Sequence, residues 1–195
     1  YGKSESTIGV KRKNYNVSAW EIPGQEYFDE LFRVSKRQII WGCNYFNYQF
    51  GPGRIVWDKV NGSSKYSDAE IAYCSEHYSV RMFRYMWNGM NQGKSIEEGH
   101  IMQGNKRLNE QRIHVTQKPV ALYKWLLQTY AKPGWKILDT HLGSGTHRIA
   151  AYDLGLPFVG VELDPEVWKR SVAYFLENRD SQTKVRMTGQ TSLFH

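Results

Sequence analysis

Hydrophobic and polar positions between residues 137 and 164 follow the order of a β-α-β unit. A short apolar run leads into Gly143-Ser144-Gly145, a helix-spaced segment follows, and a second apolar run ends at Glu162 and Asp164. Glycine lacks a Cβ, so the backbone can turn tightly and approach a ligand closely at this point. Carboxylates at the end of the second strand can accept hydrogen bonds from ribose hydroxyls. The pattern predicts a nucleotide or nucleoside site at the strand ends.

Two common nucleotide sites do not fit this turn. It has no Gly-Lys-Ser/Thr, so it is not a P-loop for triphosphates, and the third glycine of a dinucleotide site is absent. The alternative is a tight strand-to-helix turn of an α/β domain that holds no ligand.

The rest of the chain alternates helix-like and strand-like segments. Apolar spacing predicts helices at 25–36, 120–130 and 165–178, and strands at 38–41, 54–59, 71–74, 79–87 and 184–188. Residues 1–24 are polar and basic, and residues 88–113 hold four glycines without a regular apolar period. A stretch of that length without structure of its own is usually functional or disordered. The alternation predicts an α/β sheet with an antiparallel edge.

Composition narrows the class of protein. At 195 residues and 41% hydrophobic, the chain can form one domain with a core. The net charge of +7 favours an anionic partner such as nucleic acid, although a lysine excess also serves solubility. Cysteine and histidine spacing indicates neither a disulfide framework nor a metal site, which fits a cytoplasmic location. The sequence contains no run of about 18 apolar residues, so it predicts no membrane-spanning helix.

One longer motif narrows the ligand. His114-Val115-Thr116-Gln117-Lys118-Pro119 precedes a predicted helix, and Ile137-Leu138-Asp139-Thr140-His141-Leu142-Gly143-Ser144-Gly145-Thr146 follows that helix. This order resembles the amino-methyltransferases of DNA, whose signature is His-Pro-Thr-Gln-Lys-Pro, a helix, Asp-Pro-Phe-x-Gly-Ser-Gly-Thr and a strand ending in an acid. These enzymes modify adenine N6 or cytosine N4.

The resemblance implies a fold and a division of the chain. The fold is a Rossmann-like S-adenosylmethionine-dependent methyltransferase domain, with a mostly parallel central sheet, an antiparallel edge and helices on both faces. The cofactor half follows the catalytic half, which is the circularly permuted motif order called the β class. We therefore expect a single domain with a catalytic half at 1–87, a recognition-like loop at 88–113 and a cofactor half at 114–195.

The resemblance also implies the cofactor residues. The glycine turn would approach the methionine part of S-adenosylmethionine, Glu162 would hold the ribose hydroxyls, and Leu163 would lie against the adenine ring. The full implied set is Thr116, Gln117, Lys118, Pro119, Asp139, His141, Gly143, Ser144, Gly145, Thr146, Glu162, Leu163 and Asp164. Two departures stand out: Val115 replaces a proline, and Thr140-His141 replaces Pro-Phe. We expect neither to abolish cofactor binding.

The catalytic motif of this family is Asp-Pro-Pro-Tyr or a close variant, and no complete copy occurs in the chain. The chain begins Tyr1-Gly2. We expect Tyr1 to be the last residue of the motif, with Asp-Pro-Pro preceding it outside this sequence. The alternative is that Tyr1 is an arbitrary terminal residue.

The expected partner is double-stranded DNA, from which the target base rotates out of the duplex. Basic residues that could contact phosphates are Lys11, Arg12, Lys13, Lys94, Lys106, Arg107 and Arg112, although solvated surface positions would look the same. A homodimer is compatible with the sequence. The expected reaction is site-specific methylation at adenine N6, as in restriction-modification systems. Cytosine-N4 methylation, methylation of RNA or another substrate, and a non-catalytic cofactor- or DNA-binding remnant are the alternatives, and a dehydrogenase fits least.

Overall fold

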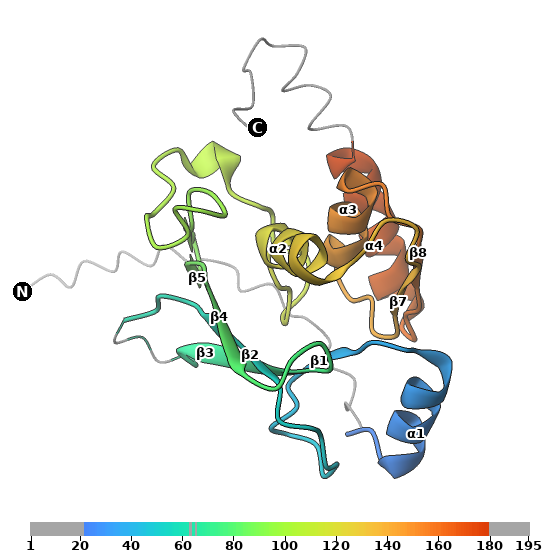
Figure 1. Cartoon of the computed structure of the whole chain (residues 1–195). Coiled ribbons are helices and arrows are strands. Elements are labelled where there is room, and N and C mark those ends of the chain that lie inside the picture. Colours follow the sequence, from blue (N-terminus) through green and yellow to red (C-terminus); the bar gives the residue numbers. More distant parts are fainter. Residues whose placement is uncertain (1–21, 63, 65, 180–195) are drawn as a thin grey trace, which may run out of the picture.

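The computed structural model describes residues 22–62, 64 and 66–179 and has the expected α/β character (Figure 1). Its helices are α1 (Gln25–Val34), α2 (Val120–Tyr130), α3 (Thr146–Asp153) and α4 (Pro165–Asn178). Its strands are β1 (Ile39–Trp41), β2 (Arg54–Asp58), β3 (Ala69–Cys74), β4 (Val80–Arg84), β5 (Trp87–Asn88), β6 (Asn91–Gln92), β7 (Ile137–Asp139) and β8 (Phe158–Gly160). These confirm the predicted β-α-β unit and all three predicted helices. The strand predicted at 184–188 lies outside the described residues.

The larger sheet has four strands in the order β1-β3-β2-β4. β3 pairs antiparallel with both β1 and β2, and β2 pairs parallel with β4. β7 and β8 form a separate parallel pair. Within the described residues the expected single, mostly parallel sheet is therefore a mixed sheet and a parallel pair. The short connection 59–68 accounts for the antiparallel pairing of β2 with β3, because antiparallel neighbours accept short connections and parallel ones need a long crossover.

Helix α2 lies between the two sheets and contributes to both cores (Figure 1). Leu122 and Leu126 pack with the buried face of the larger sheet, which includes Ile55 and Trp57. On its other side, Leu127 packs with Ala150 and Ala151 of α3, against β7 and β8. The helix carries apolar residues around most of its circumference, as expected when a helix is covered on two sides. It thereby sets the position of one half of the chain relative to the other.

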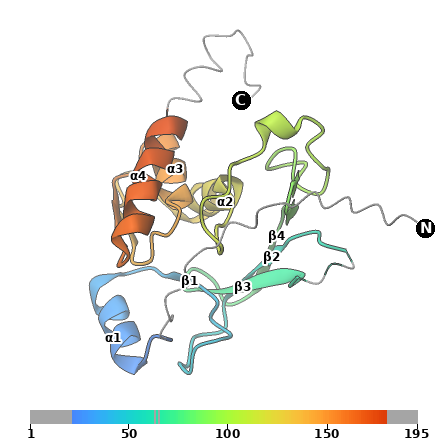
Figure 2. The ribbon, with the colours of Figure 1, turned by 180° about the vertical axis from the view of Figure 1, so that it is seen from behind.

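Helix α1 lies beside the β1 side of the larger sheet (Figure 2), and its Phe32 ring lies 6.2 Å from that of Tyr73 in β3. Phe28 is buried and lies 4.7 Å from Tyr48 and 5.3 Å from Phe50, measured between ring centroids. Phe50 stacks on Tyr73 of β3 at 5.2 Å. The amphipathic helix is thus held by an aromatic cluster, and ring contacts of this kind favour a fixed geometry.

The strand predicted at 79–87 breaks into β4 and β5, which corrects that prediction. The alternation itself continues, since Phe83, Tyr85 and Trp87 are all buried. Regular pairing with β2 ends at Arg84. Beyond it, the N–H groups of Tyr85 and Trp87 donate to the successive carbonyls of Asp58 and Lys59 at 2.9 and 3.2 Å, and the Met86 N–H donates on the other side to Gly99 at 2.8 Å. An alternation of buried and exposed side chains does not show which backbone group each residue hydrogen-bonds, so it could not predict this break.

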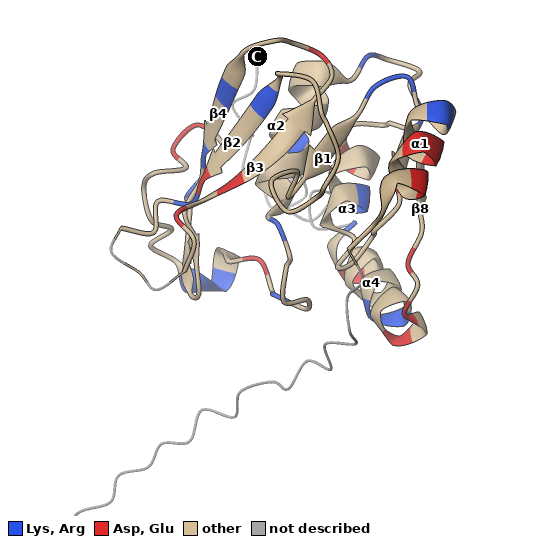
Figure 3. Cartoon of the chain, turned by 90° about the horizontal axis from the view of Figure 1, so that it is seen from below, with Lys and Arg blue, Asp and Glu red and all other residues tan. Residues whose placement is uncertain are grey.

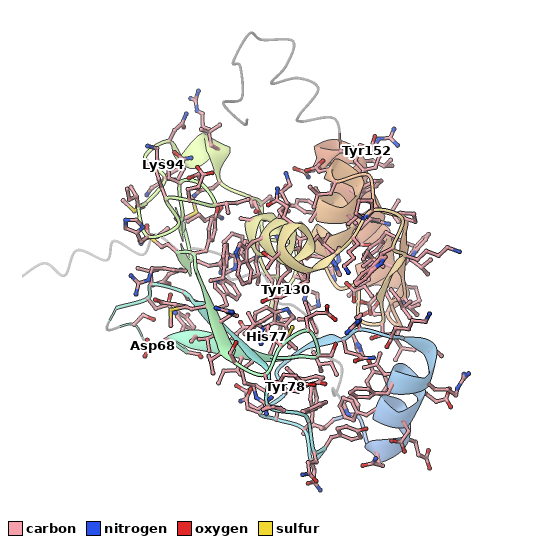
Figure 4. The ribbon with its side chains drawn as sticks, in the orientation of Figure 1. Asp68, His77, Tyr78, Lys94, Tyr130 and Tyr152 are labelled. Atoms are coloured by element: carbon pink, nitrogen blue, oxygen red, sulfur yellow. The ribbon has the colours of Figure 1, made fainter. Side chains whose placement is uncertain are left out.

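Residues 88–113 fold as a small lobe, here called the 88–113 lobe. It contains the β5–β6 hairpin, a bridge between Gly93 and Met102, and the 3-10 turn η1 (Lys106–Leu108). The Asn109 side chain donates to the carbonyl of Met90 at 2.7 Å and closes the lobe. The segment therefore has structure of its own, in short elements that apolar periodicity does not reveal. Figure 4 shows Lys94 projecting from this lobe.

Candidate functional site

The glycine turn after β7 has the backbone geometry that the sequence predicted. Gly143 and Gly145 have φ values of +54° and +74°, a region that L-residues with a Cβ rarely adopt. Gly145 is also the N-cap of α3, and its N–H donates to the carbonyl of Leu142 at 2.9 Å. A Cβ at Gly145 would lie 3.4 Å from Arg148 and from Ser171. The turn therefore brings the uncapped N-terminus of α3 to the end of β7.

The acid after β8 is tied directly to this turn. Glu162 accepts the N–H of Gly143 at 2.8 Å through Oε2 and the N–H of Asp164 at 3.1 Å through Oε1. One carboxylate thus joins the ends of the two parallel strands. Leu163 projects into solvent with 96% exposure, so its apolar side chain is available to cover a ligand. Asp164 instead caps α4, because Oδ1 accepts the N–H of Glu166 at 2.8 Å.

The segment that precedes α2 comes to the same place. Thr146 of α3 donates its hydroxyl to the carbonyl of Lys118 at 2.9 Å. His114 lies across the glycine turn, with its ring 3.8 Å from the position that a Cβ of Gly143 would take. The three predicted elements therefore converge, although they are separated in the sequence by a helix and a strand.

His114 was not among the predicted cofactor residues, and the structure adds it to the site. Its Nδ1 lies 3.1 Å from the Thr116 hydroxyl and accepts the Thr116 N–H at 3.3 Å. Burial lowers the pKa of His114, the nearby Glu162 opposes that shift, and Arg170 adds to it. A neutral imidazole can accept these hydrogen bonds, so His114 orients the otherwise exposed Thr116. The sequence feature that could have predicted this role is the position of His114 at the start of the motif.

Gln117 and Pro119 are engaged in the interior rather than presented to a ligand. Gln117 is 5% exposed, and its amide accepts from the N–H of Ile113 at 2.8 Å and donates to the carbonyl of Gln111 at 3.0 Å. Trp87 donates its indole N–H to the Gln117 carbonyl at 3.0 Å. Pro119 is fully buried beside the start of α2. These residues fix the segment that carries Thr116.

Lys118 points to the larger sheet. Its ammonium lies 3.0 Å from Glu70 of β3, and the other oxygen of Glu70 lies 2.7 Å from Lys59. Burial alone would raise the pKa of Glu70, but the charges of Lys118 and Lys59 hold it below its ordinary value. Lys118 also lies over the ring of Trp41, 5.6 Å from its centroid. Glu70, a single acid in an apolar strand, thus ties the segment before α2 to β3 of the larger sheet.

A second partly buried acid, Asp139, supports the glycine turn. Asp139 accepts the N–H of His141 at 3.0 Å, and its other oxygen lies 3.3 Å from Nδ1 of His147. His147 stacks on Tyr123 of α2 at 4.5 Å between ring centroids. Burial would raise the pKa of Asp139, yet the hydrogen bond from His147 and the partial charges nearby hold it below its ordinary value. Asp139 and the buried Ser144 and Thr146 therefore shape the turn.

Glu110 joins the 88–113 lobe to the cofactor half. Its carboxylate accepts the N–H of Val120, the first residue of α2, at 2.9 and 3.1 Å. The N-cap Pro119 offers no side-chain cap, so Glu110, ten positions before Val120, supplies one. Gln92 of β6 holds the Glu110 backbone by accepting its N–H at 2.8 Å and donating to its carbonyl at 2.9 Å. No local pattern in the sequence predicts this contact.

The basic residues of the lobe occupy two environments. Lys106 and Arg107 are exposed on η1. Lys94 is paired with Glu98 at 3.2 Å. Arg112, by contrast, lies over the ring of Trp87, 4.3 Å from its centroid. Over the described ribbon as a whole, basic and acidic positions are interspersed (Figure 3).

The remaining predicted residues lie outside the described part of the chain. These are Tyr1, Lys11, Arg12 and Lys13. Among the residues that the structure describes, no cluster of histidine, cysteine and acidic side chains could hold a metal ion, and no helix could cross a membrane.

Comparisons with solved structures give partial overlaps. The crystal structure of the M1.HpyAVI–SAM complex has a TM-score of 0.45 and 21% identity, and covers 62% of this chain and 60% of that one. A second crystal structure of M1.HpyAVI has a TM-score of 0.40 and 17% identity, and covers 62% of this chain and 57% of that one.

Two curated relatives and a family model also match the chain. Type II methyltransferase M.HinfI of Haemophilus influenzae is 24% identical over 55% of this chain and 34% of that protein. Type II methyltransferase M2.LlaDCHI of Lactococcus lactis subsp. cremoris is 24% identical over 86% of this chain and 59% of that protein. The chain thus spans less than two thirds of the length of either relative. The DNA methylase model N6_N4_Mtase matches residues 10–173. The chain therefore belongs to the N6/N4 family of DNA methylases.

Proposed function

We propose that the chain transfers a methyl group from S-adenosylmethionine to an exocyclic amino nitrogen of a base in double-stranded DNA. Adenine N6 is the proposed target, and cytosine N4 is the alternative. The observation that carries the proposal is the convergence of His114, the Gly143–Gly145 turn and Glu162 at the ends of two parallel strands. In open α/β sheets, ligands bind at this edge.

The residues at this edge fit the cofactor. The uncapped N-terminus of α3 offers backbone N–H groups to a carboxylate, as at other anion sites of helix N-termini, while the N–H groups of Gly143 and Gly145 are bonded within the site. Glu162 is placed to accept hydrogen bonds from ribose hydroxyls, and the exposed Leu163 is placed to cover an adenine ring. When bound, S-adenosylmethionine supplies an electrophilic methyl group. The contribution of these residues is to bind and orient it.

The function test uses the full-length protein with labelled S-adenosylmethionine and unmethylated DNA, followed by analysis of the labelled nucleosides. Label on adenine N6 is the expected result, and label on cytosine N4 would overturn the adenine assignment. Binding of S-adenosylmethionine without transfer to any base would support a non-catalytic remnant. Failure of the protein to bind the cofactor would overturn the proposal altogether.

We propose further that η1 of the 88–113 lobe contacts DNA phosphates through Lys106 and Arg107. Replacing both with alanine should weaken duplex binding about tenfold at moderate salt. It should also lower the slope of log affinity against log salt by about 2, since each phosphate contact contributes about 0.9. Fluorescence anisotropy with a labelled duplex over a salt series measures both quantities.

Arg112→Gln is the matched control for this experiment, because Arg112 is packed on Trp87. It should leave the salt slope unchanged. If the salt slope falls in Arg112→Gln but stays constant in the Lys106/Arg107 variant, the proposed phosphate contact through Lys106 and Arg107 is wrong.

A further inference from the structure

Three polar side chains meet where α1 approaches the cofactor half. The hydroxyl of Tyr27 in α1 lies 2.7 Å from the Thr140 hydroxyl and 3.4 Å from Nδ1 of His141. Thr140 and His141 are themselves joined, with 3.1 Å between the Thr140 hydroxyl and Nδ1. The rings of Tyr27 and His141 also meet edge to face at 5.5 Å. The three side chains form one cluster, although Tyr27 is 113 residues from Thr140.

The cluster includes Thr140-His141, one of the two places where the chain departs from the family motif. The family motif has Pro-Phe here, a pair that restricts the backbone and packs an aromatic ring without needing hydrogen bonds. Thr140 and His141 lack that stiffness and carry polar groups, of which the partly buried Thr140 hydroxyl gains most from a partner, since His141 is exposed to solvent. Tyr27 supplies those partners from the other half of the chain. The hydrogen bonds of the polar cluster can thus restrict the backbone at residues 140–141, as the fixed φ of a proline would.

Tyr27 is well placed to act as a fixed point. Its neighbour Phe28 anchors α1 in the aromatic cluster with Tyr48 and Phe50, and the Tyr27 and Phe28 rings meet at 5.1 Å. Burial raises the pKa of the Tyr27 phenol, while its hydrogen bond to Thr140 works in the opposite direction. The phenol therefore keeps its proton, and the hydrogen bond persists, throughout the neutral pH range.

The segment that Tyr27 holds leads directly into the glycine turn. Below it, the N–H of His141 donates to Asp139, and the N–H of Leu142 donates to the carbonyl of Val161 at 2.9 Å. Gly143, bonded to Glu162, follows immediately. A shift of residues 140–141 would therefore move the turn that the proposed function assigns to the cofactor.

We infer that Tyr27 is a positioning residue that acts through Thr140 and His141 to hold the cofactor turn. This inference rests on the proposed function, because it assigns the turn to S-adenosylmethionine. It makes cofactor affinity depend on a residue of α1 that does not belong to the motif. It also explains how the chain tolerates the loss of Pro-Phe.

A double-mutant cycle tests this role, with Tyr27→Phe and Thr140→Val as the single variants. Each removes one hydroxyl of the same hydrogen bond and keeps most of the side-chain volume. Each should raise the dissociation constant for S-adenosylmethionine about fivefold, and the double variant should be no worse than either single one. Isothermal titration calorimetry on the full chain measures these constants. DNA affinity should remain unchanged in all three.

Two further variants separate positioning from a general loss of structure. Thr140→Ser keeps the hydroxyl and should restore wild-type cofactor affinity. Tyr78→Phe changes a tyrosine that is 88% exposed and should have no effect (Figure 4). Additive losses in the cycle, or single variants with wild-type affinity, would overturn the inference while leaving the proposed function standing. A wild-type chain that binds no S-adenosylmethionine would overturn the proposed function, and this inference with it.

Discussion

Alanine at position 162 is expected to raise the dissociation constant for S-adenosylmethionine by about a hundredfold or more. Glu162 accepts the N–H groups of Gly143 and Asp164, so the substitution leaves two strand ends without their shared partner. It also removes the acceptor proposed for the ribose. Hydrogen bonds to a charged group contribute about 1.5–3 kcal/mol each, and a hundredfold change corresponds to about 2.7 kcal/mol.

Glu162→Gln and Glu166→Ala are the controls for this prediction. The amide retains one acceptor, so Glu162→Gln should fall between the wild type and the alanine variant. Glu166 lies four residues away on the exposed side of α4 and pairs with Lys169 at 2.7 Å, so its loss should change cofactor affinity little. Equilibrium titration of each purified variant gives the constants. Wild-type affinity in Glu162→Ala would remove Glu162 from the site.

Local patterns predicted the cofactor half closely. Helix α2, the β7–α3–β8 unit and helix α4 were expected from apolar spacing, two glycines and a proline at a helix start. Each of those signals acts within a few residues, so it survives in the sequence. The pairing between strands cannot be predicted from such local signals, because it depends on residues far apart in the sequence. The mixed sheet and the break between β4 and β5 were accordingly missed.

The site shows the same division. The motif identified the segments that meet, but it could not say which side chain of each segment faces the ligand. Gln117 and Lys118 were expected at the cofactor and are engaged with the 88–113 lobe and with Glu70. Tyr27, Glu70 and Glu110 were not expected, since their partners lie dozens of residues away or on a neighbouring element. Long-range contacts thus account for the side-chain positions of Gln117 and Lys118.

The acid that joins the 88–113 lobe to α2 leads to a prediction of stability against pH. Burial raises the pKa of Glu110 from its ordinary value of 4.5 to about 7, although the N–H of Val120 and the charges of Lys124 and Arg112 act in the opposite direction. Between these two values the folded protein holds a proton that the unfolded chain has released. The free energy of unfolding therefore falls as the pH rises through this range. The expected total loss is up to about 3 kcal/mol, at about 1.4 kcal/mol per pH unit.

Glu110→Gln should remove this pH dependence, because an amide does not titrate and its oxygen can still accept the Val120 N–H. The variant should match the wild type near pH 5 and exceed it in the free energy of unfolding near pH 8. Chemical denaturation from pH 5 to pH 8 measures the difference, with the exposed Glu97→Gln of the same lobe as the control. Parallel curves for Glu110→Gln and the wild type would mean that the carboxylate is charged throughout. That outcome would overturn the raised pKa of Glu110 and leave its hydrogen bond to the Val120 N–H as an ordinary charged cap.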